Sequence, residues 1–218
     1  MSTKGFIFDL DGVIVDTAHF HYLAWKKTAA ELGFELTVEL NEKLKGVSRI
    51  DSLQKILDWA GASITQKEFD RHTKEKNEEY LSYVNEMTTN DILPGVHRFI
   101  TMVKDKGYPF ALGSASKNAP TILSKVGLLD LFDTIVDGNS VKKAKPDPEV
   151  FLIAAQNLNV PPQDCIVFED SQAGIKAANI AGMTSIGLGE PSNLTEADEV
   201  FESFSEIKLE FIEKLITT

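Results

Sequence analysis

Short apolar segments alternate with helical patterns over most of this chain. The apolar segments end in Asp, Ser or Gly, and they predict strands at Gly5–Phe8, Pro109–Leu112, Thr134–Val136, Cys165–Phe168 and Thr184–Ile186. Between them the spacing predicts helices at Val96–Lys106, Ala119–Val126, Pro148–Asn157 and Gln172–Ala181. Nearly continuous apolar strands that alternate with helices are typical of a parallel sheet covered on both faces. The predicted fold class is therefore α/β, with a Rossmann-like, doubly wound parallel sheet as the core.

Residues 16–90 interrupt this alternation, because they contain helical patterns and no strand-like segment. Apolar side chains recur every three to four residues from Tyr22 and again from Leu53. Pro94 and Gly95 then mark the return to the alternating pattern. We therefore expect a discontinuous core domain, residues 1–15 and 91–218, with an all-helical cap domain inserted at residues 16–90. A helical unit placed directly after the first strand would cover the site as a lid.

Two carboxylates follow the first strand at Asp9 and Asp11. Side chains two positions apart in an extended segment point the same way, and Gly12 then allows the chain to turn. Crowded, buried carboxylates repel one another, and a hard cation such as Mg²⁺ relieves that repulsion. A simple turn closed by Asp and Gly is the structural alternative. The pattern makes Asp9 and Asp11 candidate catalytic and metal-binding residues.

Three further polar groups follow the later strands. Ser114 to Asn118 leads from a strand into a helix, where hydroxyl and N–H groups bind anions; ordinary helix capping is the alternative. Lys145 offers a positive charge to a phosphate, unless it is simply solvated. Glu169 and Asp170 either hold a cation or interact with the dipole of the next helix. Because strand carboxyl ends share one edge of a parallel sheet, this set favours phosphoryl transfer by an attacking carboxylate.

Composition limits the class of protein and its partners. Hydrophobic and charged residues make up 43% and 25% of the 218 residues, as in ordinary globular proteins, and the formal net charge is −11. This charge argues against nucleic acid or anionic membrane as a partner. No apolar segment approaches the roughly 20 residues that span a bilayer. The single cysteine, Cys165, excludes an internal disulfide. We expect a cytoplasmic protein, and a monomer.

The four polar groups together resemble a known set of motifs. Asp9-Leu10-Asp11-Gly12-Val13, Ser114, Lys145 and Glu169-Asp170 are similar, in this order, to the four motifs of the haloacid dehalogenase-like superfamily. The resemblance implies that Asp9 is the nucleophile and Asp11 the general acid/base of the phosphotransferase members. Dehalogenases lack an acid at the second position, so Asp11 argues against carbon–halogen chemistry. The same resemblance implies Mg²⁺ held by Asp9, the backbone carbonyl of Asp11, Glu169 and Asp170.

The predicted cap narrows the resemblance. The segment from Leu44 to Leu53 resembles the cap of the β-phosphoglucomutases, which interconvert β-glucose 1-phosphate and glucose 6-phosphate through β-glucose 1,6-bisphosphate. Small-molecule sugar phosphates are the implied partners. The transferring phosphate would contact Asp9, Ser114, Ala115 and Lys145, and the distal phosphate would contact Arg49, Ser116, Lys117 and Asn118. Residues implied at the sugar or the hinge are Thr17, His21, Lys45, Gly46, Val47, Ser52 and Lys76.

Three other functions compete with a mutase. A phosphonatase would use a cap lysine, Lys45 or Lys76, as a Schiff base, but the surrounding motif argues against it. A sugar-phosphate phosphatase of the same fold would share the nucleophile and the metal, but water would resolve its intermediate. The segment from Lys45 to Arg49 favours the mutase, because a second phosphate grip is redundant for hydrolysis of a monophosphate. A non-catalytic sugar-phosphate sensor would not need both Asp9 and Asp11. For His21, a structural histidine is as good an interpretation as a catalytic one.

Overall fold

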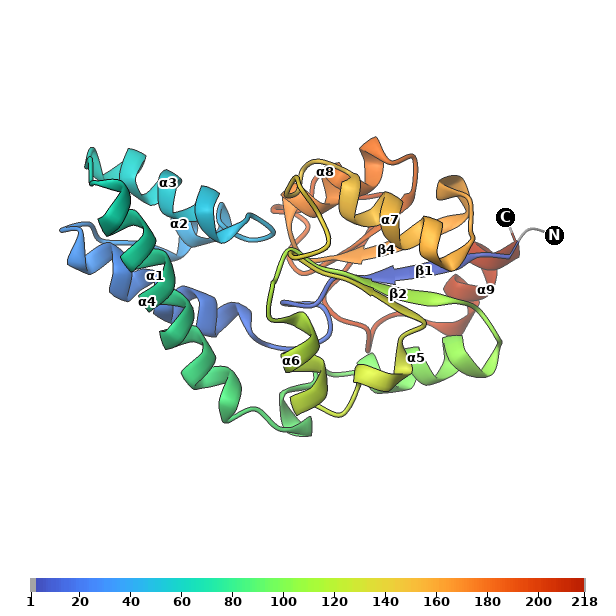
Figure 1. Cartoon of the computed structure of the whole chain (residues 1–218). Coiled ribbons are helices and arrows are strands. Elements are labelled where there is room, and N and C mark those ends of the chain that lie inside the picture. Colours follow the sequence, from blue (N-terminus) through green and yellow to red (C-terminus); the bar gives the residue numbers. More distant parts are fainter. Residues whose placement is uncertain (1–2, 218) are drawn as a thin grey trace.

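A parallel sheet forms the larger lobe of the computed structural model, which describes residues 3–217 (Figure 1). Within these residues the sheet has six strands in the order β3-β2-β1-β4-β5-β6, and every neighbouring pair is parallel. The strands are β1 Gly5–Phe8, β2 Phe110–Gly113, β3 Thr134–Val136, β4 Cys165–Glu169, β5 Thr184–Leu188 and β6 Glu199–Phe201. The predicted α/β class with a doubly wound parallel sheet is confirmed.

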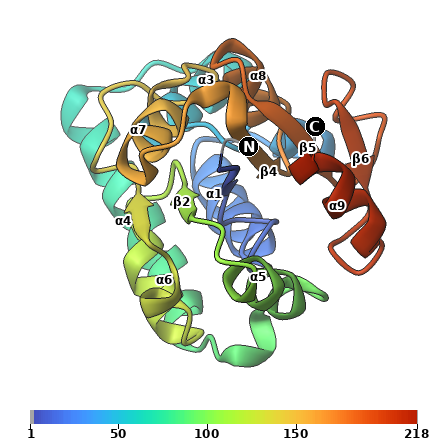
Figure 2. The ribbon, with the colours of Figure 1, turned by 90° about the vertical axis from the view of Figure 1, so that its right-hand side faces the viewer.

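Helices cover both faces of this sheet (Figure 1). One face carries α7 Glu149–Leu158 and α8 Gln172–Ile180, and the other carries α5 Val96–Asp105, α6 Ala119–Lys125 and α9 Leu209–Thr217. Figure 2 shows the same two helical layers from the side. Short 3-10 turns lie at Thr89–Asp91, Leu129–Leu131 and Pro162–Asp164. The sheet is thus shielded from water on both faces, which fits its almost uniformly apolar strands.

The bounds of three predicted strands differ in the structure: β4 and β5 extend to Glu169 and Leu188, and β2 is shifted by one residue at each end. Strand β2 begins at Phe110 rather than Pro109, because proline has no N–H to give to a ladder. Pro109 still contributes its carbonyl, which accepts a hydrogen bond from the N–H of Phe6 at 3.0 Å. Strand β6 and helix α9 lie beyond the last element that the sequence pattern predicted.

Strand β1 lies between β2 and β4, at the point where the connections change direction along the sheet. Phe8 pairs with Phe168 of β4, and their rings stack with centroids 5.1 Å apart. The residues that follow this pair, Asp9 and Glu169, therefore emerge side by side at the carboxyl edge. In open α/β sheets this edge, at this switch point, is where ligands bind.

Four helices between β1 and α5 form the second lobe (Figure 1). They are α1 Ala18–Glu31, α2 Val38–Glu42, α3 Arg49–Ala60 and α4 Gln66–Asn85. Trp25, Leu53 and Ile56 are buried in a small apolar core of their own. Ser48 caps α3. Thr65 caps α4, because its hydroxyl accepts from the N–H of Glu68 and the Glu68 carboxylate accepts from the N–H of Thr65. We retain residues 16–90 as the proposed cap domain. None of the described helices is long and apolar enough to cross a membrane.

Candidate active site

Lys145 joins two buried carboxylates at the carboxyl edge of the sheet. Its Nζ donates hydrogen bonds to Oδ1 of Asp9, at 2.6 Å, and to Oε1 of Glu169. Nζ also lies 4.7 Å from the ring centroid of Phe151. Burial lowers the pKa of Lys145, but the two carboxylates outweigh this effect and raise it, so the lysine stays charged. Lys145 is therefore a fixed positive charge beside Asp9.

Glu169 is held by the start of helix α8. The backbone N–H and the hydroxyl of Ser171 both donate to Oε2 of Glu169 at 2.8 Å, and the hydroxyl accepts from the N–H of Gly174 at 3.1 Å. A side chain on Gly174 would overlap the Glu169 carboxylate. Serine capping and a close glycine therefore fix the carboxylate in one position.

Asp170 contacts the cap. Nζ of Lys45, from the loop between α2 and α3, lies 3.2 Å from Oδ2 of Asp170. Burial raises the pKa of Asp170 to about 7, against the opposing charge of Lys45. Gly12, with φ of 80°, lies so close to Asp170 that a Cβ atom would overlap its carboxylate. An ion pair across the two lobes thus ends on a carboxylate of the candidate metal site.

The donor set at this edge fits Mg²⁺. Burial raises the pKa of Asp9, and the charges of Glu169 and Asp170 raise it further, against Lys145. Such crowding of buried carboxylates is relieved by a dication, and all the side-chain donors are oxygen atoms, which Mg²⁺ prefers.

Asp11 is held from the cap side. Its Oδ1 accepts hydrogen bonds from the hydroxyls of Thr17 and Tyr80, the latter at 3.4 Å, and lies 3.6 Å from Nε2 of His21. Burial raises the pKa of Asp11, but the contacts with His21 and Thr17 outweigh it, so the pKa is lowered. Asp11 lies outside the strand, where it forms a bridge with Val15. The carboxylate is therefore positioned by residues near the junction with the cap.

Lys76 is a buried lysine in the middle of α4. Its Nζ lies 2.7 Å from Nδ1 of His21 and 4.8 Å from the ring centroids of both Trp25 and Tyr80. Burial and, to a smaller extent, the charge of Arg49 lower the pKa of Lys76 to about 7. Helix α4 thus carries a buried lysine of unusually low basicity.

The lowered pKa of Lys76 predicts a pH-dependent stability. Between pH 7 and 9 the unfolded chain binds a proton on Lys76 that the folded chain does not bind, so stability rises with pH. Relative to Lys76→Met, the wild-type protein should gain roughly 2 kcal/mol of unfolding free energy over this range. Urea titrations at each pH measure it, with Lys74→Met, whose side chain is 76% exposed, as the control. Parallel profiles for the wild type and Lys76→Met would contradict the prediction.

The loop after β2 supplies hydroxyl and amide groups. Oγ of Ser114 accepts from the N–H of Ser116 at 3.0 Å, and Oγ of Ser116 accepts from the N–H of Asn118 at 3.3 Å. The side-chain amide of Asn118 donates to Oδ1 of Asn77, on α4, at 3.0 Å. Lys117 is exposed. This loop thus contacts the cap through α4, whereas Lys45 contacts Asp170 from the loop between α2 and α3.

A cavity of about 450 Å³ lies between the two lobes. Of the residues predicted from the sequence it is lined by Asp9, Asp11, His21, Lys45, Gly46, Val47, Arg49, Ser52, Lys76, Ser114, Ala115, Ser116, Lys117, Asn118, Lys145 and Asp170. Thr17 and Glu169 do not line it, because each lies behind a lining residue to which it is bonded. Sequence analysis missed Asn77, Tyr80 and Ser171 as members of this site.

Comparison with known proteins identifies the family. A family model described as haloacid dehalogenase-like hydrolase matches residues 3–182. The chain belongs to the haloacid dehalogenase-like family. The resemblance inferred from the motifs at Asp9, Ser114, Lys145 and Glu169 is thereby confirmed at the level of the family.

Relatives in this family include mutases and phosphatases. β-Phosphoglucomutase of Bacillus subtilis is 41% identical over 211 residues, which cover 96% of this chain and 93% of the relative. The crystal structure of β-phosphoglucomutase from Clostridium difficile superposes with a TM-score of 0.93 at 45% identity, covering 99% and 97% of the two chains. A phosphatase of phosphorylated carbohydrates from Thermotoga maritima is 31% identical over 90% of this chain and 89% of its own.

Proposed function

We propose that this chain is a phosphomutase that interconverts β-glucose 1-phosphate and glucose 6-phosphate. The observation that carries the proposal is the cavity between the lobes, which has candidate phosphate contacts at two places. Asp9, Ser114 and Lys145 line it from the sheet, whereas Arg49 and Asn118 line it beside the cap. A sugar bisphosphate has one phosphate for each set. The likeness to two β-phosphoglucomutases supports the same reaction.

Asp9 is the proposed nucleophile. A carboxylate oxygen of Asp9 attacks phosphorus of the bisphosphate, and the bond from phosphorus to the sugar oxygen breaks. Asp11, which takes up a proton from the sugar hydroxyl in the other half of the cycle, returns it to that leaving oxygen, which becomes a hydroxyl. Lys145, held beside Asp9, offsets negative charge on the transferring phosphoryl group. The products of this step are an aspartyl phosphate and a sugar monophosphate.

The second step reverses the first after the sugar turns around. The other sugar hydroxyl attacks the phosphorus of phosphorylated Asp9 and loses its proton to Asp11. Mg²⁺, proposed to be held by Asp9, the carbonyl of Asp11, Glu169 and Asp170, neutralises phosphate charge when bound. Cap contacts such as that of Lys45 with Asp170 exclude water, which would otherwise hydrolyse the aspartyl phosphate.

Arg49 is the proposed grip for the phosphate that is not transferring. It begins helix α3 and lines the cavity, and burial lowers its pKa. A planar guanidinium binds two phosphate oxygens at once, and an anion also benefits from the adjacent N-terminus of the helix. A monophosphate held at Asp9 leaves this grip without a partner, so Arg49 matters for the mutase in particular.

Phosphorus NMR of β-glucose 1-phosphate, with enzyme, Mg²⁺ and a trace of bisphosphate, tests the proposal. Glucose 6-phosphate should accumulate without matching inorganic phosphate. Arg49→Ala should lower mutase turnover by about 100-fold, the equivalent of one lost charge-assisted interaction of 2–3 kcal/mol, and should spare hydrolysis of a small aryl phosphate. Equal losses in both reactions would count against the two-phosphate site.

A sugar-phosphate phosphatase is the second candidate. The carbohydrate phosphatase relative at 31% identity favours it, and the nucleophile would be the same. In the NMR experiment, release of inorganic phosphate in step with the loss of substrate would replace the mutase proposal by this one.

A further inference from the structure

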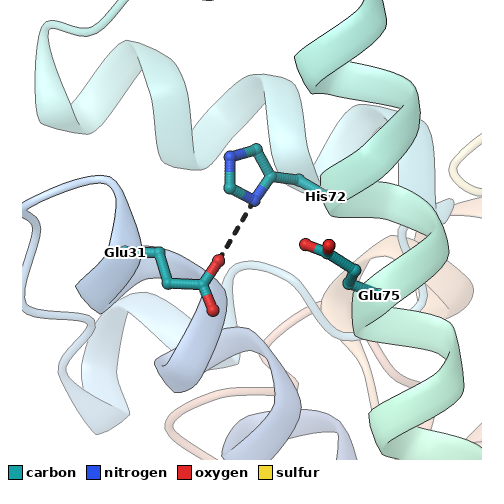
Figure 3. A group of neighbouring side chains, drawn as sticks. All are labelled: Glu31, His72 and Glu75. Carbon is teal, nitrogen blue, oxygen red and sulfur yellow. Dashed lines mark ion pairs between the residues drawn. The ribbon is translucent and has the colours of Figure 1, made fainter.

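A second group of potential metal ligands lies in the cap, away from the cavity between the lobes. Glu31 ends helix α1, and His72 and Glu75 lie one turn apart on α4 (Figure 3). One ligand atom from each of these side chains lies within 4.8 Å of the other two. Within the part of the chain that the structure describes, no other trio of His, Cys, Asp or Glu meets this distance.

His72 provides an independent sign of a missing ligand. The residue is 4% exposed, and its Nδ1 is buried without a hydrogen-bond partner among the described residues. Nδ1 faces Oε2 of Glu31 at 3.4 Å, and Figure 3 shows the Glu75 carboxylate pointing toward the same space. A buried polar atom without a partner is costly, and in native proteins it calls for an explanation. Two carboxylates near one another add repulsion that a dication would remove.

We propose that Glu31, His72 and Glu75 bind a transition-metal dication of the zinc class. One imidazole nitrogen and two carboxylate oxygens suit Zn²⁺, which accepts three protein ligands and a water molecule. The carboxylate side chains are 45% and 47% exposed, so they can adjust to the ion and water can reach it. Mg²⁺ prefers oxygen ligands alone, so this site differs from the one beside Asp9.

Arg71 competes with a metal ion for His72 and Glu75. Its guanidinium donates to Oε2 of Glu75 at 2.8 Å and lies 3.1 Å from Nε2 of His72. Because arginine can only donate, Nε2 must accept, and the imidazole proton is therefore on Nδ1. When a metal takes Nδ1, that proton moves to Nε2, and Arg71 loses its acceptor. The Arg71 side chain is 51% exposed and is free to turn into water.

The ion would connect the end of α1 to the middle of α4, the two long helices of the cap. We expect Zn²⁺ to raise the melting temperature of the protein through this link, since a ligand that binds only the folded state stabilises it. The cavity between the lobes is lined by other residues, so the site acts on the cap rather than on the reacting groups.

Calorimetric titration with ZnCl2 tests the proposal. It uses Asp170→Asn as the background, which weakens metal binding beside Asp9. In that background Glu75→Gln and Glu31→Gln should each lower the zinc affinity at least about tenfold. Even the loss of a residue that only orients a metal ligand lowers metal affinity about 10–100-fold. Glu78→Gln is the matched control, because Glu78 also pairs with a cation four residues away on α4. Arg71→Gln should raise the affinity.

Nitrogen NMR of the histidine side chains gives a direct readout. Zinc should move the His72 signals from the Nδ1–H tautomer to the Nε2–H tautomer, with Nδ1 bound to metal. Apart from Asp170→Asn, all these substitutions are at exposed side chains, so we expect each variant to fold. Equal zinc affinity in Glu75→Gln and Glu78→Gln, or unchanged His72 signals at saturation, would overturn the proposal.

Discussion

Replacement of Asp9 by Asn is expected to reduce mutase turnover by about four orders of magnitude or more, as the loss of other nucleophiles does. The amide has nearly the same shape but cannot form the acyl phosphate. The folded structure should persist, because Lys145 keeps its bond to Glu169 and one buried charge fewer remains. Turnover is measured by coupling glucose 6-phosphate to its dehydrogenase, and the acyl phosphate by mass spectrometry after acid quench.

The control for Asp9→Asn is Asp105→Asn, an exposed acid at the end of α5 that does not line the cavity. It should keep full activity. If Asp9→Asn retained a few per cent of the wild-type turnover, or if label appeared on another residue, Asp9 would not be the nucleophile.

Replacement of Lys145 by Met is expected to cost about 3–5 kcal/mol of unfolding free energy, since it leaves Asp9 and Glu169 buried without their common cation. The side chain of Lys145 is fully buried, so water cannot replace it. Millimolar Mg²⁺ should restore part of the loss, because the same carboxylates are its proposed ligands. Urea denaturation with and without Mg²⁺ gives both values.

Lys143→Met is the matched control for this experiment. Lys143 pairs with Asp147 at 3.1 Å, but its side chain is 72% exposed, so its loss should change stability by no more than about 0.5 kcal/mol. A loss below 1 kcal/mol for Lys145→Met would show that the buried cation is not needed to hold the two carboxylates.

The sheet and its carboxyl edge could be predicted because short apolar segments in the sequence identify the strands. Apolar segments such as Gly5–Phe8 predicted strands, and parallel pairing then places whatever follows each strand at one edge. The pairing of Phe8 with Phe168 explains why Asp9 and Glu169 meet although 160 residues separate them. Strand β6, at Glu199–Phe201, is a three-residue edge strand with only part of its surface buried, so its apolar signal is too short.

The contacts between the lobes could not be predicted in the same way. Tyr80 donates to Asp11, and Asn77 accepts from Asn118, because of how α4 lies against the core in three dimensions. Helical periodicity shows which residues share a face, but it does not show what that face meets. Ser171 was missed for another reason, since a serine that caps a helix has the same pattern whether or not it also holds a carboxylate.

The ion pair between Lys45 and Asp170 would link the position of the two lobes to the binding of the proposed Mg²⁺. Lys45 contacts Oδ2 of Asp170, and the same carboxylate is a proposed ligand of Mg²⁺, so the contact with the cap and the proposed ion act on one another through one side chain. By thermodynamic reciprocity, opening of the lobes must change the affinity for the ion by the same factor as ion binding changes the equilibrium between closed and open lobes. Opening of the lobes to release product would then also change the affinity for the proposed ion.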